Sequence, residues 1–281
     1  MTSRPAIGGP LRRGLATLLA LLALLGSVGP LGTARAQSRE LDWQDEWRRY
    51  GAVDAGVTVG LAALGLLINE LAPNRMGRRG EGILFDEPAR DALRLGEGVA
   101  RRRARTTSDV FLATMIAWPV VDSLAVWGRG EGDTGLQLFG VTSLAFASTY
   151  GLLSGLKRLV GRPRPYARLC GSGQLVGEPF EDCRDEDRFR SFPSGHVAYT
   201  FTGASLVCTS HLHLPVYGRR GADITACATA LAVAFTTGLL RMMGDVHYAT
   251  DVVGGAFLGA LSGFLLPSLL YYGFDGNGPP F

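Results

Sequence analysis

Three short polar clusters in this sequence hold residue types that can bind and activate an anion. They are KRLVGRPRP (157–165), PSGH (193–196) and RMMGDVHYATD (241–251). Within them, Lys157, Arg164 and Arg241 supply three cations. A Lys offers a compact charge, and an Arg offers a planar fork of donors. Three such cations in one place suit a tetrahedral oxyanion, most naturally phosphate.

The second cluster adds backbone donors and a histidine to this anion site. Ser194 and Gly195 lie where an apolar segment begins, and the first N–H groups of a helix are free to bind an anion. Gly195 has no Cβ, so a ligand can approach its backbone closely. His196 would meet the bound anion and could protonate a leaving oxygen.

The third cluster contains a candidate nucleophile. His247 and Asp251 are four residues apart, which would place them on one helix face within hydrogen-bonding reach. A carboxylate on one ring nitrogen fixes the tautomer and leaves the other nitrogen free, as an oriented nucleophile or base. A metal site at this pair is the alternative, but cations dominate nearby. His211 and His213 could also suggest a metal, yet they end a segment without partners, and we expect them to be interfacial.

Each cluster also has an ordinary structural explanation when it is taken alone. PSGH is typical of a turn followed by a helix start, polar pairs four residues apart are common on helix surfaces, and GRPRP (161–165) is typical of a loop. Lys157 is the single Lys among 28 basic residues, and compositional drift explains it equally well. No cluster is therefore specific by itself.

Six apolar segments must position these clusters. Each could form a helix of about 20 residues, which would cross a bilayer core of ~30 Å, and the alternation typical of strands is missing. The segments cover 51–72, 108–127, 136–156, 197–214, 222–240 and 252–270. Each cluster opens or closes a segment, so we expect an all-α, six-helix bundle core with the three clusters at one end.

We expect this bundle to be embedded in a membrane, with a soluble bundle as the alternative. Gly255, Gly259 and Gly263 are spaced so that helices could approach closely. Against spanning, the apolar segments contain polar residues and their hydropathy is borderline; these residues are Asp54, Asp122, Asn69 and Glu70. The net charge is only +3, and no stripe of basic and aromatic residues is present. We therefore expect no nucleic-acid partner and infer no obligate protein partner.

The first 36 residues have the pattern of an export signal. Arg4, Arg12 and Arg13 precede a short apolar core at 14–26, and an A-x-A motif ends at Ala36. An uncleaved membrane helix is the alternative. The sequence thus predicts a signal peptide at 1–36, a polar stretch at 37–50, and a helical-bundle domain at 51–275 with motifs at 157–165, 193–196 and 241–251.

Four cysteines fall into two pairs. Cys170 and Cys183 flank a polar, Gly-rich, acidic stretch, and we expect a disulfide to close this loop in an exported protein. Cys208 and Cys227 lie on consecutive apolar segments at similar distances from a short turn. They could form a second bridge, but we expect the more common outcome, which is small buried thiols.

Together, the clusters resemble the three-part signature of the type 2 phosphatidic acid phosphatase and vanadium haloperoxidase superfamily. Lys157, Arg164 and Pro165 match K-x6-RP, residues 193–196 match PSGH, and Arg241, His247 and Asp251 match SR-x5-H-x3-D. Leu240 stands where the pattern has Ser, which removes one possible hydrogen bond to phosphate. Order and spacing are kept over about 95 residues, and the sole Lys of the chain is the family Lys.

The resemblance implies a role for each matched residue. His247 would attack phosphorus and form a phosphohistidine, oriented by Asp251. His196 would protonate the leaving alkoxide and then activate water. The phosphoryl oxygens would be held by Lys157, Arg164, Ser194, the Gly195 N–H and Arg241. No metal or other cofactor is needed for the phosphatase reaction, and vanadate is implied only for a haloperoxidase.

The resemblance thus predicts a metal-independent phosphatase for a phosphomonoester or diphosphate, with a phosphorylated lipid as its substrate and the membrane as its environment. The alternatives are a soluble exported acid phosphatase of broad specificity and a vanadate-dependent haloperoxidase. A catalytically inactive anion-binding protein is a further alternative, but the intact set of His196, His247 and Asp251 argues against it.

Two signals conflict over the side of the membrane that carries the site. A cleaved signal followed by six spans would put the site in the cytoplasm, together with the Arg-rich residues 73–107, as the positive-inside rule prefers. The predicted Cys170–Cys183 bridge and the family's usual arrangement favour the exported side. We expect a cell-membrane protein with its active site on the exported side, and a periplasmic or secreted soluble enzyme as the alternative.

Overall fold

The computed structural model describes residues 41–72, 82–170, 183–184 and 186–274. These residues form seven α-helices and contain no strand: α2 (Ala52–Leu71), α3 (Asp86–Leu93), α4 (Gly98–Gly128), α5 (Gly132–Val160), α6 (Gly195–His213), α7 (Arg220–Met243) and α8 (Ala249–Ala260). Two short 3-10 helices, η1 (Pro165–Leu169) and η3 (Glu186–Phe189), precede α6. The π-helical turns η4 (Leu261–Leu265) and η5 (Ser268–Tyr272) continue α8. The predicted signal peptide at 1–36 lies outside the described residues.

The all-α prediction is confirmed, whereas the count of six helices is not. Each predicted apolar segment coincides with a long helix, but α3 adds a seventh. Asp86 and Glu87 lie in the first turn of α3 and Arg90 in its last, which complements the helix dipole at both ends. α3 packs against α7 and α8. A short polar helix of this kind is not visible as an apolar segment.

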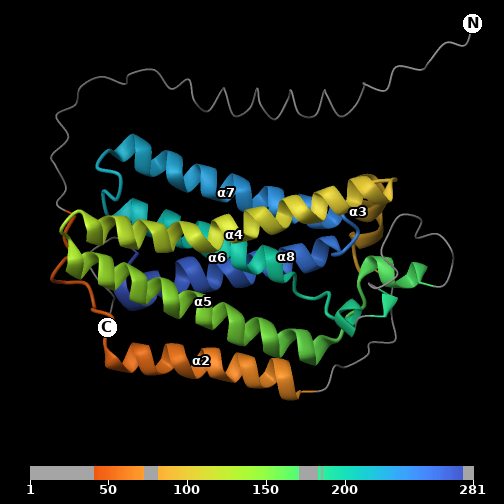
Figure 1. Ribbon diagram of the computed structural model, residues 1–281, viewed down its shortest axis with the longest axis horizontal. Coiled ribbons are helices and arrows are strands. Elements are labelled where there is room, and N and C mark those ends of the chain that lie inside the picture. Colours follow the sequence, from red (N-terminus) through yellow and green to blue (C-terminus); the bar gives the residue numbers. More distant parts are fainter. Residues whose placement is uncertain (1–40, 73–81, 171–182, 185, 275–281) are drawn as a thin grey trace, which may run out of the picture. The chain divides into compact units, whose positions relative to one another are not determined.

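The long helices run alongside one another and alternate in direction (Figure 1). The last turns of α5 and α7 and the first turns of α4, α6 and α8 therefore lie at the same end of the bundle, which also carries α3. We call this the α3 end. All three polar clusters begin or end a helix at the α3 end, as their positions in the sequence predicted.

Glycines set the distance between α6 and α8. α6 contacts α4, α5, α7 and α8, so it lies at the centre of the bundle. A Cβ added to Gly255, Gly259 or Gly263 would lie 2.6, 2.4 or 2.4 Å from a backbone oxygen on the α6 side. The prediction that these glycines allow close helix packing is confirmed.

The outer surface of the bundle is apolar. Five stretches in the described part of the chain are long and apolar enough to cross a membrane: Ala52–Leu71, Gly98–Gly128, Gly132–Leu169, Arg220–Met243 and Ala249–Tyr272. On α2, Val53, Val59 and Leu71 are 75%, 69% and 76% exposed. Soluble proteins rarely expose contiguous apolar surfaces of this extent. These surfaces indicate a membrane protein, although α6 is not among the five stretches.

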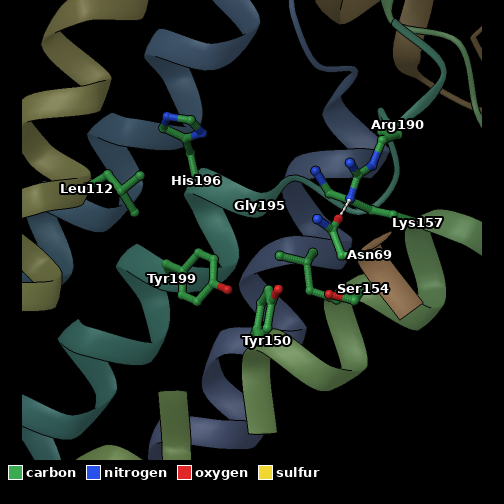
Figure 2. A pocket seen from close by; sticks show the side chains of 10 residues that line it. Asn69, Leu112, Tyr150, Ser154, Lys157, Arg190, Gly195, His196 and Tyr199 are labelled. Atoms are coloured by element: carbon green, nitrogen blue, oxygen red, sulfur yellow. Dashed lines mark hydrogen bonds between the residues drawn. The ribbon is translucent and has the colours of Figure 1, made fainter. Parts of the chain in front are cut away.

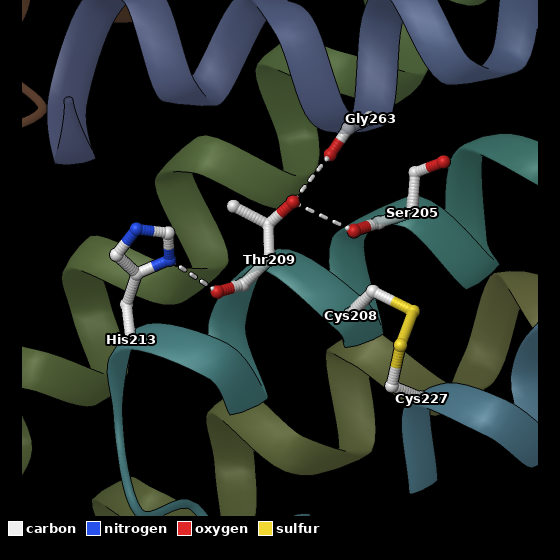
Figure 3. The surroundings of a disulfide bond; sticks show 6 residues. All are labelled: Ser205, Cys208, Thr209, His213, Cys227 and Gly263. Atoms are coloured by element: carbon white, nitrogen blue, oxygen red, sulfur yellow. Dashed lines mark hydrogen bonds between the residues drawn. A yellow bond between two sulfur atoms is a disulfide. The ribbon is translucent and has the colours of Figure 1, made fainter. Parts of the chain in front are cut away.

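The interior between the helices is rich in hydroxyl groups. Thr149 Oγ1 on α5 lies 2.8 Å from Thr202 Oγ1 on α6. Thr209 Oγ1 donates to Ser205 O at 2.8 Å and to Gly263 O at 3.3 Å (Figure 3). Small and hydroxyl-bearing residues at helix contacts are typical of membrane bundles.

A disulfide between Cys208 and Cys227 joins α6 to α7 (Figure 3). The expectation of two small buried thiols is therefore wrong, and the alternative of a second bridge holds. The antiparallel helices bring the two Cα atoms within 4.3 Å. Similar distances from the connecting turn were the signal in the sequence that allowed this pairing.

The end of the bundle opposite the α3 end holds a buried cluster around His211. Its Nδ1 lies 2.6 Å from Asp223 Oδ1 on α7, and its Nε2 lies 3.2 Å from Asp122 Oδ2 on α4. Tyr217 donates its hydroxyl to Asp122 at 2.9 Å. The prediction that His211 is interfacial and without partners is wrong, because both carboxylates come from other helices. His213 stacks on the Tyr272 ring at 4.7 Å.

Candidate active site

The last turn of α5 carries the first predicted cation, Lys157. Gly161 ends the helix in the left-handed conformation (φ 58°) and donates its N–H to Lys157 O. The Lys157 ammonium lies against the start of α6, since a Cβ added to Gly195 would be 3.4 Å from Lys157 Nζ. The absence of a side chain at Gly195 therefore leaves room for Lys157.

Arg164 connects the loop before α6 to His247. It donates from Nε to Asp187 O at 3.0 Å and from Nη2 to Asp187 Oδ2 at 2.5 Å. Its Nη1 donates to Val246 O at 3.3 Å and lies 3.4 Å from His247 Nε2. Arg164 therefore lies next to the ring nitrogen that does not face Asp251.

The third predicted cation, Arg241, lies at the end of α7 and is held by α4. Its Nη1 donates to Ser108 Oγ at 3.1 Å and approaches Asp109 Oδ1 at 3.5 Å. Leu240, which departs from the family pattern, precedes it in the chain. The family pattern has a Ser hydroxyl at position 240, and in this chain a hydroxyl beside Arg241 is supplied instead by Ser108 on α4. Ser108 also donates to Arg105 O at 2.6 Å, so its orientation is fixed.

His196 lies in the first turn of α6 and donates from Nε2 to Asp109 Oδ1 at 2.7 Å. Asp109 therefore contacts two of the predicted site residues, His196 and Arg241. Asp109 could not be predicted from the sequence as a site residue, because its segment bears no fixed spacing to the three clusters. Burial, followed by the charge of Arg241, lowers the pKa of His196 to about 4, although the hydrogen bond with Asp109 acts in the opposite direction.

The structure corrects the predicted pairing of His247 with Asp251. α8 begins at Ala249, so His247 precedes the helix and does not share a helix face with Asp251. His247 Nδ1 lies 3.7 Å from Asp251 Oδ2, which is too long for a hydrogen bond. That oxygen accepts instead from Tyr248 N at 2.8 Å and from Ser191 Oγ at 2.6 Å. A fully buried carboxylate nevertheless remains within ion-pair distance of the ring.

A buried network that the sequence analysis missed holds Asp251 in place. Arg162 donates to Asp251 Oδ1 at 2.7 Å and to Asp86 Oδ2 at 2.6 Å. Thr250 donates its N–H and its hydroxyl to Asp86, both at 2.8 Å. Burial alone would raise the pKa of Asp86, but the hydrogen bonds from Arg162 and Thr250 lower it. The network ties α3 to the start of α8.

Several buried polar side-chain atoms at the α3 end have no hydrogen-bond partner among the described residues. Among them are Ser194 Oγ, Arg190 Nε, Arg241 Nε and His247 Nδ1. A buried donor left without a partner costs about 1–3 kcal/mol, and proteins satisfy such groups with a ligand, ion or water. Ser194 is also the N-cap residue of α6, without a hydrogen bond from its side chain to the helix, and the first N–H groups of a helix can bind an anion. Ser194 Oγ and Arg241 Nε are groups that an oxyanion would satisfy, whereas His247 Nδ1 faces Asp251.

Asp187 balances part of the positive charge of the site. It contacts Arg164, and its pKa, which burial alone would raise, is lowered by the charges of Arg164 and Lys157. It is therefore ionised at neutral pH. An incoming phosphate must compete with this carboxylate for Arg164.

The ring of His247 is neutral at neutral pH. Burial lowers the pKa of His247 well below its usual value, and the charges of Arg164, Arg241 and Lys157 act in the same direction. A neutral imidazole has one N–H and one nitrogen with a free lone pair. With Nδ1–H toward Asp251, the lone pair of Nε2 is available beside Arg164.

A cavity of about 240 Å³ opens beside Lys157 and His196 (Figure 2). Its polar lining includes Asn69 and Arg190, neither of which was predicted from the sequence to belong to the site. Apolar and aromatic side chains form the rest of the wall: Leu112, Tyr150, Leu153 and Tyr199. The cavity can thus accommodate a group that is charged at one end and apolar at the other.

A disulfide joins Cys170 to Cys183 in the connection that leads to η3 and Asp187. Residues 171–182, which lie between the two cysteines, are outside the described part of the chain. Within the described part, no group of three or more His, Cys, Asp or Glu side chains is arranged to hold a metal ion.

Residues 139–275 match the family model of the PAP2 superfamily. The match confirms the resemblance to the type 2 phosphatidic acid phosphatase superfamily, and this segment, which contains all three clusters, belongs to it. Asp86 and Asp109, on α3 and α4, lie outside the matched segment. Part of the candidate site is therefore contributed by residues that the family pattern does not cover.

Two curated proteins are similar to this chain. One, named "Probable lipid phosphate phosphatase 4" from Arabidopsis thaliana, is 30% identical over 139 residues, or 44% of either chain. The other, named "Probable diacylglycerol pyrophosphate phosphatase 1" from Schizosaccharomyces pombe, is 28% identical over 134 residues, or 42% of this chain and 47% of the relative. The chain thus spans less than half the length of the curated relatives it matches. No solved structure matches the chain.

Proposed function

We propose that this protein is a metal-independent phosphatase that hydrolyses a phosphomonoester or diphosphate of a lipid through a phosphohistidine intermediate. One observation carries the proposal. Ser194 and Arg241 each carry a buried polar atom without a hydrogen-bond partner, His247 Nε2 lies beside Arg164, and all four residues are at positions that match the family signature. Lys157 and Arg164 add the positive charge that stabilises a transferred phosphoryl group.

The reaction would proceed in two steps. His247 Nε2 attacks phosphorus, the bond to the leaving oxygen breaks, and His196 gives that oxygen a proton. Water then attacks the phosphohistidine, the phosphorus–nitrogen bond breaks, and His196 takes the proton from water. Asp109 would stabilise the protonated form of His196, from which it is 2.7 Å away.

Asp251 would act as a positioning residue for His247. Its carboxylate faces Nδ1 and favours the tautomer in which Nε2 carries the lone pair. Arg162 and Ser191 would hold Asp251 in that position through their hydrogen bonds. The positive charge that forms on the ring after attack would be stabilised by the same carboxylate.

We further propose that the substrate is a lipid in the membrane that surrounds the bundle. The relatives' names refer to a lipid phosphate and to diacylglycerol pyrophosphate, and the outer surface of α2 is apolar. We place the α3 end on the exported side, because the disulfide between Cys170 and Cys183 precedes Asp187 in the chain. Cytoplasmic thiol pools would reduce an exposed bridge.

The test is phosphate release by the purified full chain in detergent, with EDTA present. The panel contains a lipid monophosphate, a lipid diphosphate and p-nitrophenyl phosphate. We expect release from the lipids and a loss of several orders of magnitude in His247→Ala. His213→Ala, which changes a histidine at the opposite end of the bundle, is the matched control. Activity that requires a divalent metal, or that survives in His247→Ala, would contradict the proposal, as would halide oxidation with vanadate and peroxide in place of hydrolysis.

A further inference from the structure

The cavity beside the candidate site lies on the leaving-group side of the proposed reaction. It is lined by Lys157, Gly195 and His196, the proposed acid, whereas His247 does not line it (Figure 2). In phosphoryl transfer the nucleophile and the leaving oxygen are roughly in line on opposite sides of phosphorus. A substrate attacked by His247 would therefore extend its leaving group into this cavity.

Arg190 gives this cavity a cation that belongs to none of the three clusters. One of its Nη groups donates to Asn69 Oδ1, and its Nε is buried without a hydrogen bond, 3.8 Å from Asp187 Oδ1. Figure 2 shows the guanidinium of Arg190 hydrogen-bonded to Asn69, and Lys157 lines the same cavity. The backbone of Arg190 is fixed, because its N–H donates to Asp187 O at 3.0 Å.

The transferred phosphoryl group does not need Arg190. It has three non-bridging oxygens, and the donors already assigned to them exceed that number: Lys157, Arg164, Ser194, the Gly195 N–H and Arg241. Burial lowers the pKa of Arg190, although Asp187 acts in the opposite direction. The charge of Arg190 is thus only partly compensated, which favours a further anion in the cavity.

We propose that Arg190, together with Lys157 and Asn69, forms a second anion subsite that binds a leaving group which is itself a phosphate. This inference rests on the proposed function. It selects a monoester of diphosphate over a simple phosphomonoester as the preferred substrate. Arg190 is then the residue that determines this preference.

The shape of the cavity agrees with such a leaving group. Its volume of about 240 Å³ is that of about eight water molecules, which is enough for a phosphate and the first carbons of a chain. Those carbons would meet the apolar part of the wall, formed by Leu112, Tyr150, Leu153 and Tyr199. The remainder of an apolar chain would extend beyond the cavity.

The reaction balances without a further reactant. His247 Nε2 attacks the terminal phosphorus, and the bond from that phosphorus to the bridging oxygen breaks. The bridging oxygen takes a proton from His196 and leaves as an alkyl monophosphate, whose negative charge Arg190 and Lys157 stabilise. Water then releases orthophosphate from His247 and returns a proton to His196.

The first test measures binding to the full chain in detergent with two non-hydrolysable probes, methylenediphosphonate and methylphosphonate. We expect the diphosphonate to bind at least tenfold more tightly, and this ratio to fall at least tenfold in Arg190→Gln. Arg190→Lys, which keeps the charge, should retain most of the preference. The matched control is Arg158→Gln. Arg158 donates from Nη2 to the backbone carbonyl oxygen of Asn69, but it does not line the cavity.

Equal affinities in the wild type, or a preference that Arg190→Gln keeps, would overturn the second subsite. An equal loss in Arg158→Gln would also overturn it, because Arg190 would then act only by holding Asn69. The wild-type comparison remains decisive even if Arg190→Gln fails to fold.

The second test separates this inference from the proposed function. One alkyl chain is supplied as its monophosphate and as its diphosphate, and kcat/KM is measured for both. We expect the diphosphate-to-monophosphate ratio to fall at least tenfold in Arg190→Gln. Hydrolysis of the monophosphate with no preference that depends on Arg190 would refute the subsite and leave the proposed function intact. A third outcome is that the protein hydrolyses neither the monophosphate nor the diphosphate, yet binds the diphosphonate in a way that depends on Arg190. This outcome would refute the proposed function and leave the subsite intact.

Discussion

Replacing Arg162 with Met should reduce both stability and activity, although Arg162 is assigned no contact with the transferred phosphoryl group. Its guanidinium donates to Asp86 and to Asp251, and both carboxylates are fully buried. Met is a flexible side chain of similar length, so it fills most of the volume. The substitution therefore removes the charge and the hydrogen bonds without leaving a large cavity.

The expected loss follows from the burial of this pair. Removing one partner of a buried ion pair costs about 3–5 kcal/mol, because the remaining charge is left uncompensated. For a chain of this size, such a loss lowers the unfolding temperature by on the order of 10 °C. Asp251 would also lose its fixed position beside His247. Small misplacements at a reacting centre reduce turnover by about 100-fold, so we expect kcat to fall by a similar factor.

Thermal unfolding in detergent and phosphate release measure the two effects, with Arg168→Met as the matched control. Arg168 pairs with Glu87, which is also on α3, at 2.7 and 2.9 Å, but both side chains are about one-third exposed. Exposed pairs contribute at most about 1 kcal/mol, so the control should unfold within a few degrees of the wild type. The reasoning is refuted if Arg162→Met unfolds at the same temperature as Arg168→Met and keeps its kcat.

Three further predictions concern the cation, the nucleophile and the helix packing. Lys157→Arg should lower kcat/KM more than threefold, because Lys157 Nζ lies against Gly195 and a guanidinium is wider than an ammonium group. A change in kcat/KM of less than threefold, or ~0.7 kcal/mol, would contradict this. The pKa of His247 is lowered well below its usual value, so the ring should stay neutral and kcat/KM should not fall as the pH decreases through 6.5. The pH profile of kcat/KM must first be corrected for the ionisation of the substrate phosphate near pH ~6. A loss with its midpoint at 6.5 or above would show that His247 titrates normally. Gly259→Leu should destabilise the bundle by about 1–3 kcal/mol or more. Gly60→Leu is the control, because a Cβ at Gly60 would meet no atom within 4 Å, and it should not destabilise the bundle. Equal unfolding temperatures of the two variants would contradict the close packing of α6 on α8.

Much of the fold could be predicted because its signals are local. A helical stretch of about 20 apolar residues, or a glycine every four residues, is visible in a short window, and the stretch Ala249–Tyr272, which comprises α8 and the π-helical turns after it, shows both. α3 is not visible as an apolar segment, because four of its eight residues are charged. Its first residue, Asp86, is held by contacts with Arg162 and Thr250, which are distant in the sequence. α4 starts ten residues before its predicted apolar segment, since Arg101 is buried in its first turns and donates to Leu95 O and Gly96 O.

The site was predictable only where its residues keep a fixed spacing. The three clusters supply Lys157, His196 and His247 in this way. The contact between Asp109 and His196 joins residues 87 positions apart, and no local pattern encodes it. The predicted hydrogen bond between His247 and Asp251 failed for a different reason: a spacing of four residues implies a helix, but the helix begins only at Ala249.

The central claim is that His247 becomes phosphorylated during turnover. The most direct measurement is a single-turnover reaction with a substrate carrying a radioactive terminal phosphate, quenched in alkali, in which phosphohistidine is stable. Mass spectrometry of the digested protein then locates the label. We predict a phosphohistidine at position 247 that forms and decays at rates consistent with kcat, and no label in His247→Ala. Turnover without a labelled enzyme, or a label on any other residue, would contradict the account.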